Sequence, residues 1–212
     1  MEKKELDIKI WEFRNHVRQT YASLEEQKKV FQNINMALKG DPHAMLFIGE
    51  RISCFDQALS CYWIEKAAYE KDLPEAYYSL ANCYFWGCGV EKDFDIVFEL
   101  IEKAIQKGCK SWNSFLCYYL EEVNPERVVP YYLHGYSEGE AELKYQAASR
   151  LCAIYSGILY PQLRNREKYY YWLNLLRKSR PDYYDYPDFF NDPDFFDHQP
   201  RKYKFFFIGN EI

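Results

Sequence analysis

The chain has 212 residues, and 48% of them are hydrophobic, which is enough to bury a substantial core in one or two domains. Its 27 Lys and Arg are fewer than its 32 Asp and Glu, so the net charge of -5 lacks the basic excess expected of a nucleic-acid-binding protein. The charged start Met1–Asp7 resembles no signal peptide and no segment approaches the length of a membrane span, so we expect a cytoplasmic protein with neither nucleic acid nor membrane as partner.

Motifs for metal binding, cofactor binding and catalysis are missing from the sequence. The four histidines stand in no His-x-x-x-His spacing, and the seven cysteines form no Cys-x-x-Cys. A Gly-x-Ser-x-Gly motif and a glycine-rich phosphate loop are absent as well. We therefore expect no metal, no cofactor and no enzymatic activity.

The cysteines are an odd number in a chain without a visible export signal. Such cysteines are typically reduced and buried as small apolar residues. The prediction covers Cys54, Cys61, Cys83, Cys88, Cys109, Cys117 and Cys152.

Two helical patterns fill residues 4–39. Apolar residues recur every three or four positions, first from Leu6 to Val17 and then from Leu24 to Leu38. We expect residues 1–39 to form a helical pair that covers one end of a stack.

Three similar turns punctuate the middle of the chain. Gly40, Asp72 and Gly108 each stand four residues before the first core position of an expected helix. The helix after Gly40 is expected to begin at Asp41-Pro42, because a capping residue followed by proline favours a helix start. Its partner is expected over residues 57–71.

Residues 58–108 contain one sequence unit almost twice. The segment Trp63–Ala68 is similar in sequence to the later segment Leu100–Ile105. Between them, a helix is expected over residues 74–86, followed by a turn with two glycines and by Asp93 as the cap of the next helix. A repeat period of this kind is typical of stacked helical units.

The unit resembles the Sel1-like repeat, a relative of the tetratricopeptide repeat. The residues that carry the resemblance are Trp63, Lys66, Ala67, Ala68, Ala76, Leu80, Tyr84, Gly87, Gly89, Val90 and Asp93. The resemblance implies an all-α fold, a right-handed α-solenoid of antiparallel helix pairs, that acts as a protein-binding scaffold.

The match weakens after Gly108 and then returns. Trp112 stands at the expected alanine position, and residues 121–125 replace the Gly-x-Gly loop. Residues 128–139 are expected to be a short helix and loop that depart from the repeat. The pattern resumes with Ala147, Leu151, Tyr155 and Trp172, so the solenoid is expected over residues 40–180.

Residues 181–212 have a different character. Between 182 and 197 they combine aspartates with aromatic rings and carry no Lys or Arg. So many rings are too hydrophobic for an ordinary disordered segment. We expect an irregular, acidic and aromatic tail that packs on the solenoid.

Adjacent tyrosines suggest a binding surface. Neighbouring rings point about 100° apart on a helix, so we expect some to be exposed, where tyrosine is enriched at protein interfaces. The expected partner contacts are Tyr78, Trp112, Tyr118, Tyr119, Tyr131, Tyr132, Tyr136, Tyr169, Tyr183, Tyr184 and Asp185. The residues expected to maintain the repeat are Trp63, Ala67, Ala76, Leu80, Tyr84, Gly87, Gly89, Asp93, Ala147, Leu151, Tyr155 and Trp172.

The predicted function is non-enzymatic protein binding. Small acidic proteins of this repeat type include bacterial immunity proteins that neutralise a cognate toxin, and the chain resembles them in build. One alternative is a general scaffold or adaptor in a signalling or envelope assembly. Another is an exported, disulfide-linked repeat enzyme or cell-wall binder, for which the spacing of Cys109 and Cys117 is suggestive.

Overall fold

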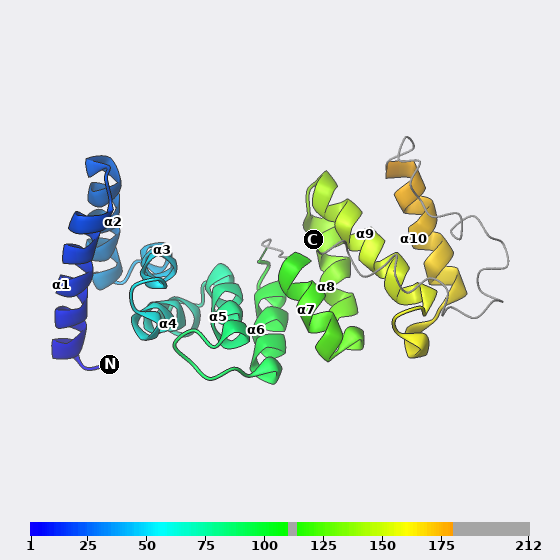
Figure 1. Cartoon of the computed structure of the whole chain (residues 1–212), viewed down its shortest axis with the longest axis horizontal. Helices are drawn as coiled ribbons and strands as arrows, with labels where there is room; N and C mark the ends of the chain where they lie inside the picture. Colours follow the sequence, from blue (N-terminus) through cyan, green and yellow to red (C-terminus); the bar gives the residue numbers. More distant parts are fainter. Residues whose placement is uncertain (110–113, 180–212) are drawn as a thin grey trace. The chain divides into compact units, whose positions relative to one another are not determined.

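A computed structural model describes residues 1–109 and 114–179, and within these ranges every regular element is a helix (Figure 1). The chain divides into two compact units, Met1–Ser111 and Trp112–Ile212. Within the described ranges, no helix is both long and apolar enough to cross a bilayer.

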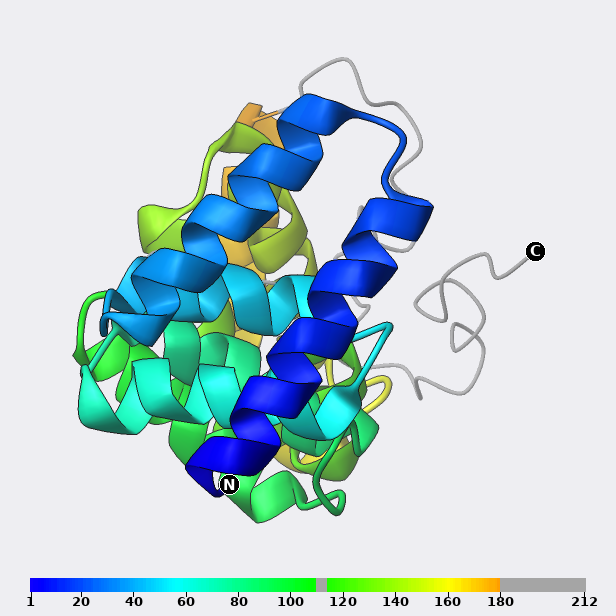
Figure 2. The same cartoon turned by 90° about the vertical axis from the view of Figure 1, so that its left-hand side faces the viewer.

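Unit 1 contains three antiparallel helix pairs. They are α1 (Lys3–Thr20) with α2 (Leu24–Leu38), α3 (Pro42–Ile52) with α4 (Gln57–Glu65), and α5 (Pro74–Trp86) with α6 (Phe94–Gln106). Figure 2 shows α1 and α2 lying side by side across the front of the unit, and α2 packs against α3. The helix α4 continues as a π-helical turn, Lys66–Glu70, that the sequence pattern did not predict.

The described part of unit 2, residues 114–179, contains two further pairs. They are α7 (Ser114–Val123) with α8 (Pro125–Glu138), and α9 (Ala141–Ser156) with α10 (Arg166–Ser179). A short 3-10 helix, Pro161–Leu163, connects the last pair. In each pair of the repeat we refer to the first helix, α3, α5, α7 or α9, as helix A.

The helix boundaries follow from capping chemistry. Asp41, Asp56 and Asp93 each accept a hydrogen bond from a backbone N–H in the first turn of the following helix, and Asn124 does the same for α8. The recurring turn predicted at Gly40, Asp72 and Gly108 is confirmed, because all three residues have a positive φ.

One predicted irregularity is wrong. Residues 128–139 belong almost entirely to the 14-residue helix α8, which forms a normal pair with α7. Pro130 lies inside this helix, where it removes one backbone hydrogen bond without ending the helix. The expected tail over residues 181–212 lies outside the described residues.

The repeat residues lie where helices approach one another. The repeat residues with at most 2% exposure are Trp63, Ala67, Ala76, Leu80, Ala147 and Leu151, and Tyr155 and Trp172 are 6% exposed. Tyr84 is half-buried, and Asp93 caps α6. Gly87 ends α5 in the left-handed conformation, which a residue with a side chain rarely adopts.

Candidate binding groove

A cavity of about 240 Å³ lies on the helix A face of unit 1. It is lined by Glu50, Ser53, Ser60, Ile64, Ser79, Asn82, Cys83, Trp86 and Cys88. Glu50 and Trp86 are exposed, so the cavity is accessible from solvent, and we refer to it as the groove.

A glycine sets the depth of the groove. Gly49 of α3 is buried against α4, where a Cβ atom would lie 2.6 Å from Ile64 and 3.2 Å from the carbonyl oxygen of Ser60. The Ser60 hydroxyl donates a hydrogen bond of 2.7 Å to the Gly49 carbonyl oxygen. This close approach fixes α3 against α4 beneath the groove.

The three serine hydroxyls of the groove, and one amide hydrogen of Asn82, are already donated to other groups of the protein. The hydroxyl of Ser53 donates to the Glu50 carbonyl oxygen at 2.8 Å, and the hydroxyl of Ser79 donates to Glu50 Oε1 at 2.9 Å. Ser60 is used in the same way, and Asn82 Nδ2 donates to the Tyr78 carbonyl oxygen at 3.2 Å. A hydroxyl carries a single hydrogen, so these serines can only accept a further hydrogen bond.

Among the described lining residues, Glu50 is the only one with a formally charged side chain. Glu50 is exposed, and the indole of Trp86, which is 48% exposed, lies at the end of α5. Phe85 contacts the Trp86 ring edge to face, with ring centroids 4.8 Å apart, and supports its position. The groove therefore combines one negative charge, hydrogen-bond acceptors and an exposed aromatic surface.

Thiols form part of the groove wall. Cys83 and Cys88 line it, and Cys61 lies next to Cys83. A hydrogen bond from the Cys61 thiol lowers the pKa of Cys83, whereas the same interaction and burial raise the pKa of Cys61. All seven cysteines are thiols in the structure, including the buried Cys109 and Cys117. The expected burial is wrong for Cys54, which is exposed, and for Cys88, which is half-buried at the groove wall.

Four of the tyrosines expected to contact a partner are buried. Tyr78 is 9% exposed, Tyr131 is 2% exposed, and Tyr132 and Tyr169 are fully buried. The expected exposure of Tyr131 and Tyr132 as partner contacts is wrong, because α8 packs against both α7 and α9. A helix between two neighbours has buried sides in two directions, so these rings are part of the core.

The other predicted contact residues are distributed differently. Tyr118, Tyr119 and Tyr136 are half-buried. Tyr136 packs edge to face on Trp172, with ring centroids 4.9 Å apart. Trp112, Tyr183, Tyr184 and Asp185 lie outside the described residues. None of the predicted contacts that the structure describes lines the groove, so the tyrosine pattern did not locate it.

A buried polar cluster occupies the related positions of unit 2. The carboxylate of Glu121, which is fully buried, accepts hydrogen bonds from Arg150 at 2.6 and 3.2 Å and from the Tyr132 hydroxyl at 2.8 Å. The Arg150 guanidinium lies over the Tyr118 ring, 4.8 Å from its centroid. We refer to these four residues as the arginine cluster.

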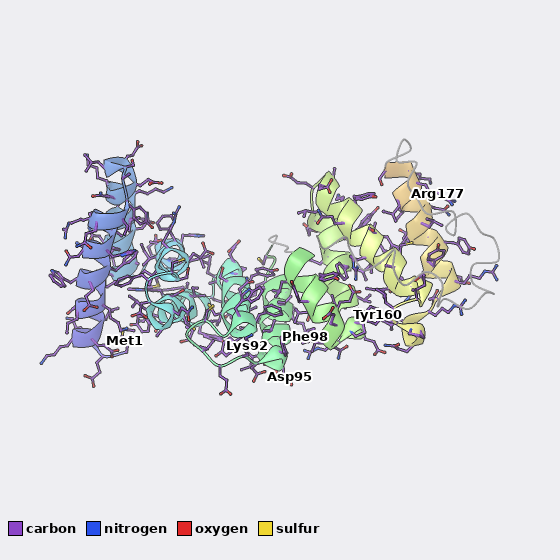
Figure 3. All side chains as sticks on the ribbon, viewed as in Figure 1. Met1, Lys92, Asp95, Phe98, Tyr160 and Arg177 are labelled. Atoms are coloured by element: carbon purple, nitrogen blue, oxygen red, sulfur yellow. The ribbon has the colours of Figure 1, made fainter. Side chains whose placement is uncertain are left out.

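Tyr160, labelled in Figure 3, lies close to the arginine cluster from the loop before Pro161–Leu163. Burial and the neighbouring Glu121 raise the pKa of Tyr160, and they raise the pKa of Tyr132 as well. Both phenols therefore remain protonated and can donate to the carboxylate.

Comparisons with known proteins identify the fold. No sequence-family model and no curated protein matches the chain. Among solved structures, a Sel1 repeat protein from Oxalobacter formigenes matches with a TM-score of 0.51 and 20% identity, over 74% of this chain and 65% of that one. A protective antigen present in uropathogenic Escherichia coli strains, which displays an SLR fold, also matches with a TM-score of 0.51 and 20% identity, over 70% of this chain and 33% of that one.

The prediction of an all-α solenoid of the Sel1-like type is thus confirmed at the level of the fold. The chain spans less than two thirds of the first matched protein and about one third of the second.

Proposed function

We propose that the chain is a non-enzymatic module that binds another protein and that the groove between α3 and α5 is a contact site. The observation that carries the proposal is the lining of this groove. Its acceptors face an accessible space beside an exposed tryptophan, an arrangement suited to a donor-rich side chain of a partner. The division into a cap over residues 1–39, a solenoid over 40–180 and a packed tail over 181–212 remains part of the proposal.

The more specific proposal is that the partner is a bacterial toxin domain and that the chain is its immunity protein. The net charge of -5 and the carboxylate in the groove support a basic partner, since opposite charges accelerate association and disfavour wrong partners. Blocking of a toxin would require one tight complex. A general adaptor would instead bind several partners with modest affinity.

Affinity capture with two matched variants tests protein binding through the groove. The full chain, the groove variant Trp86→Ala and the control variant Tyr171→Ala are immobilised and exposed to lysate and culture supernatant of the native host. Tyr171 is also an exposed aromatic residue, but it lies on α10 in unit 2. A specific partner should be retained by the full chain and the control, and lost with Trp86→Ala.

Co-expression then tests the immunity proposal. The captured partner is expressed in a bacterial host with the full chain or with Trp86→Ala. Growth arrest that the full chain relieves and the groove variant does not would support immunity. A partner that never impairs growth would refute immunity and favour an adaptor. Equal capture by all three immobilised proteins would refute the groove as the contact site.

A further inference from the structure

We propose that the groove binds the arginine side chain of a partner protein, an inference that rests on the proposed protein-binding function. The groove offers mainly acceptors. The hydroxyl hydrogens of Ser53, Ser60 and Ser79 are all directed to protein oxygens. The other donors of the described lining are the second amide hydrogen of Asn82, the indole N–H of Trp86 and the weakly donating thiols.

A lining rich in acceptors and with one carboxylate selects its ligand by charge and hydrogen bonding. A guanidinium group has five N–H donors and no acceptor, so it suits such a lining. A carboxylate or phosphate would be repelled by Glu50 and would face mostly lone pairs. A neutral amide carries no charge to pair with Glu50. The groove therefore favours a cation that donates in several directions.

Arginine fits better than lysine because of Trp86. A guanidinium is planar and weakly hydrated, so it can lie against an indole while its N–H groups bond to a carboxylate. Glu50 and the exposed part of the Trp86 indole, which both line the groove, provide these two partners. A lysine ammonium is a strongly hydrated point charge, so it could pair with the carboxylate but would lie less well against the indole.

The size of the groove agrees with a single side chain. Its volume of about 240 Å³ is below the roughly 300 to 1,000 Å³ typical of small-molecule sites. A metabolite is thus less well accommodated than one long side chain that enters from a partner surface.

Unit 2 already shows an arginine bound in this way. Arg150 directly precedes the buried Leu151 of α9, just as Ser79 directly precedes the buried Leu80 of α5. In unit 2 the guanidinium lies between the carboxylate of Glu121 and the ring of Tyr118. In unit 1 the position equivalent to Arg150 is occupied by the small Ser79. An arginine at this place would therefore have to come from another protein.

The test uses a titration of the full chain, labelled with ¹⁵N, with N-acetyl-arginine amide as probe. Binding is followed by NMR through the indole N–H resonance of Trp86, which is assigned with Trp86→Phe. N-acetyl-citrulline amide serves as the neutral probe of nearly the same shape, and N-acetyl-lysine amide as the second cation. We expect a saturable shift with arginine, a weaker effect with lysine and little effect with citrulline.

Two variants assign the effect to the groove charge. Glu50→Gln should weaken arginine binding by at least about tenfold, because a charge-assisted hydrogen bond is lost. The matched control Glu25→Gln removes the same charge from the exposed first turn of α2 and should leave binding unchanged. Equal shifts with citrulline, stronger binding of lysine, or unchanged binding by Glu50→Gln would overturn the proposal.

Failure of this inference can be separated from failure of the proposed function. If a protein partner is lost with Trp86→Ala but retained with Glu50→Gln, protein binding stands and the arginine site is refuted. If the probe titrates as expected but no partner depends on Trp86, the site stands and the proposed function is refuted.

Discussion

Three equivalent positions along the A helices have different roles in the two units. In unit 1, Glu50 and Ser53 stand two and five residues after the buried Ile48. In unit 2, Tyr118 and Glu121 stand two and five residues after the buried Leu116. Together with the pair Ser79 and Arg150, these positions line an accessible groove in unit 1 and form the arginine cluster in unit 2. One backbone framework therefore carries an accessible groove or a buried polar cluster, according to the side chains placed on it.

Burial explains why the two carboxylates behave differently. Glu121 is fully buried, and Arg150 and Tyr132 supply its hydrogen bonds. Glu50 is exposed and accepts a hydrogen bond from Ser79. A buried charge must be paired inside the protein, whereas an exposed one can be paired by a ligand. The comparison predicts stability defects in unit 2 and binding defects in unit 1.

The largest expected effect comes from removing the arginine of the cluster. Arg150→Ala would leave the buried charge of Glu121 without its cation, which typically costs about 3 to 5 kcal/mol. Urea denaturation followed by circular dichroism measures the loss. The double variant Glu121→Gln/Arg150→Met removes the charge as well as its partner and should recover much of the stability. A single variant as stable as the original chain would refute a structural role of the cluster.

The loop after helix A provides the second test. In unit 1 this loop passes so close to α4 that a Cβ atom on Gly89 would lie 2.2 Å from the carbonyl oxygen of Gln57. Gly108 has nearly the same φ, 79° against 78°, but nothing lies within 4 Å of its Cβ position. Gly108→Ala should cost about 1 to 2 kcal/mol through the left-handed conformation alone.

Gly89→Ala should cost more than Gly108→Ala, because the backbone of Gln57 cannot move away without displacing α4. The same denaturation measurement compares the two variants. Equal losses would show that the loop of unit 1 is not seated against α4. Unit 2 has Tyr160 in its corresponding loop, near the arginine cluster.

The third test converts the groove of unit 1 into the arrangement of unit 2. Ser79→Arg places an arginine of the chain itself beside Glu50, and we expect the free energy of unfolding to change by no more than about 1 kcal/mol. The new side chain should compete with N-acetyl-arginine amide and abolish its binding. Ser79→Ala, which leaves the groove open, is the matched control. A probe that still binds to Ser79→Arg would mean that the two units are not related in the proposed way.

Much of the fold could be predicted from the sequence, because local chemistry determines it. The caps Asp41 and Asp93, the prolines at helix starts and the positive φ positions act within a few residues of the chain. The prediction failed for residues 128–139, where the tyrosines and glycines suggested a loop. Packing of α8 between α7 and α9 outweighs these local preferences.

The groove could not be predicted from the tyrosine pattern. A pair of adjacent rings indicates exposure only when a helix has a single buried face, and α5 and α8 each have neighbours on two sides. The available signal was a difference between repeats, with Ser79 before one core leucine and Arg150 before another. The hydrogen-bond directions that make the groove an acceptor site depend on contacts between α3 and α5, such as that of Ser79 with Glu50.

The smallest expected effect concerns a partly exposed ion pair in unit 1. Lys9 of α1 contacts Asp56, which also caps α4 through the backbone N–H of Leu59. Burial opposes ionisation of Asp56, but the hydrogen bonds from Lys9 and Leu59 prevail and lower its pKa. A lowered folded-state pKa stabilises the fold above the unfolded pKa of about 3.9, and this contribution is lost as the pH falls through the folded value.

Asp56→Asn retains a capping side chain but removes the charge, so it should cost about 0.2 to 1 kcal/mol at neutral pH. Thermal unfolding is measured at neutral pH and at about pH 3, where Asp56 is mostly ionised and partly protonated, respectively. The stability difference between the variant and the original chain should shrink at the lower pH, because Asp56 is then increasingly protonated in both the folded and the unfolded chain. A stability difference that stays constant with pH would assign the effect to the cap alone. A loss as large as that of Arg150→Ala would remove the contrast between the exposed and the buried ion pair.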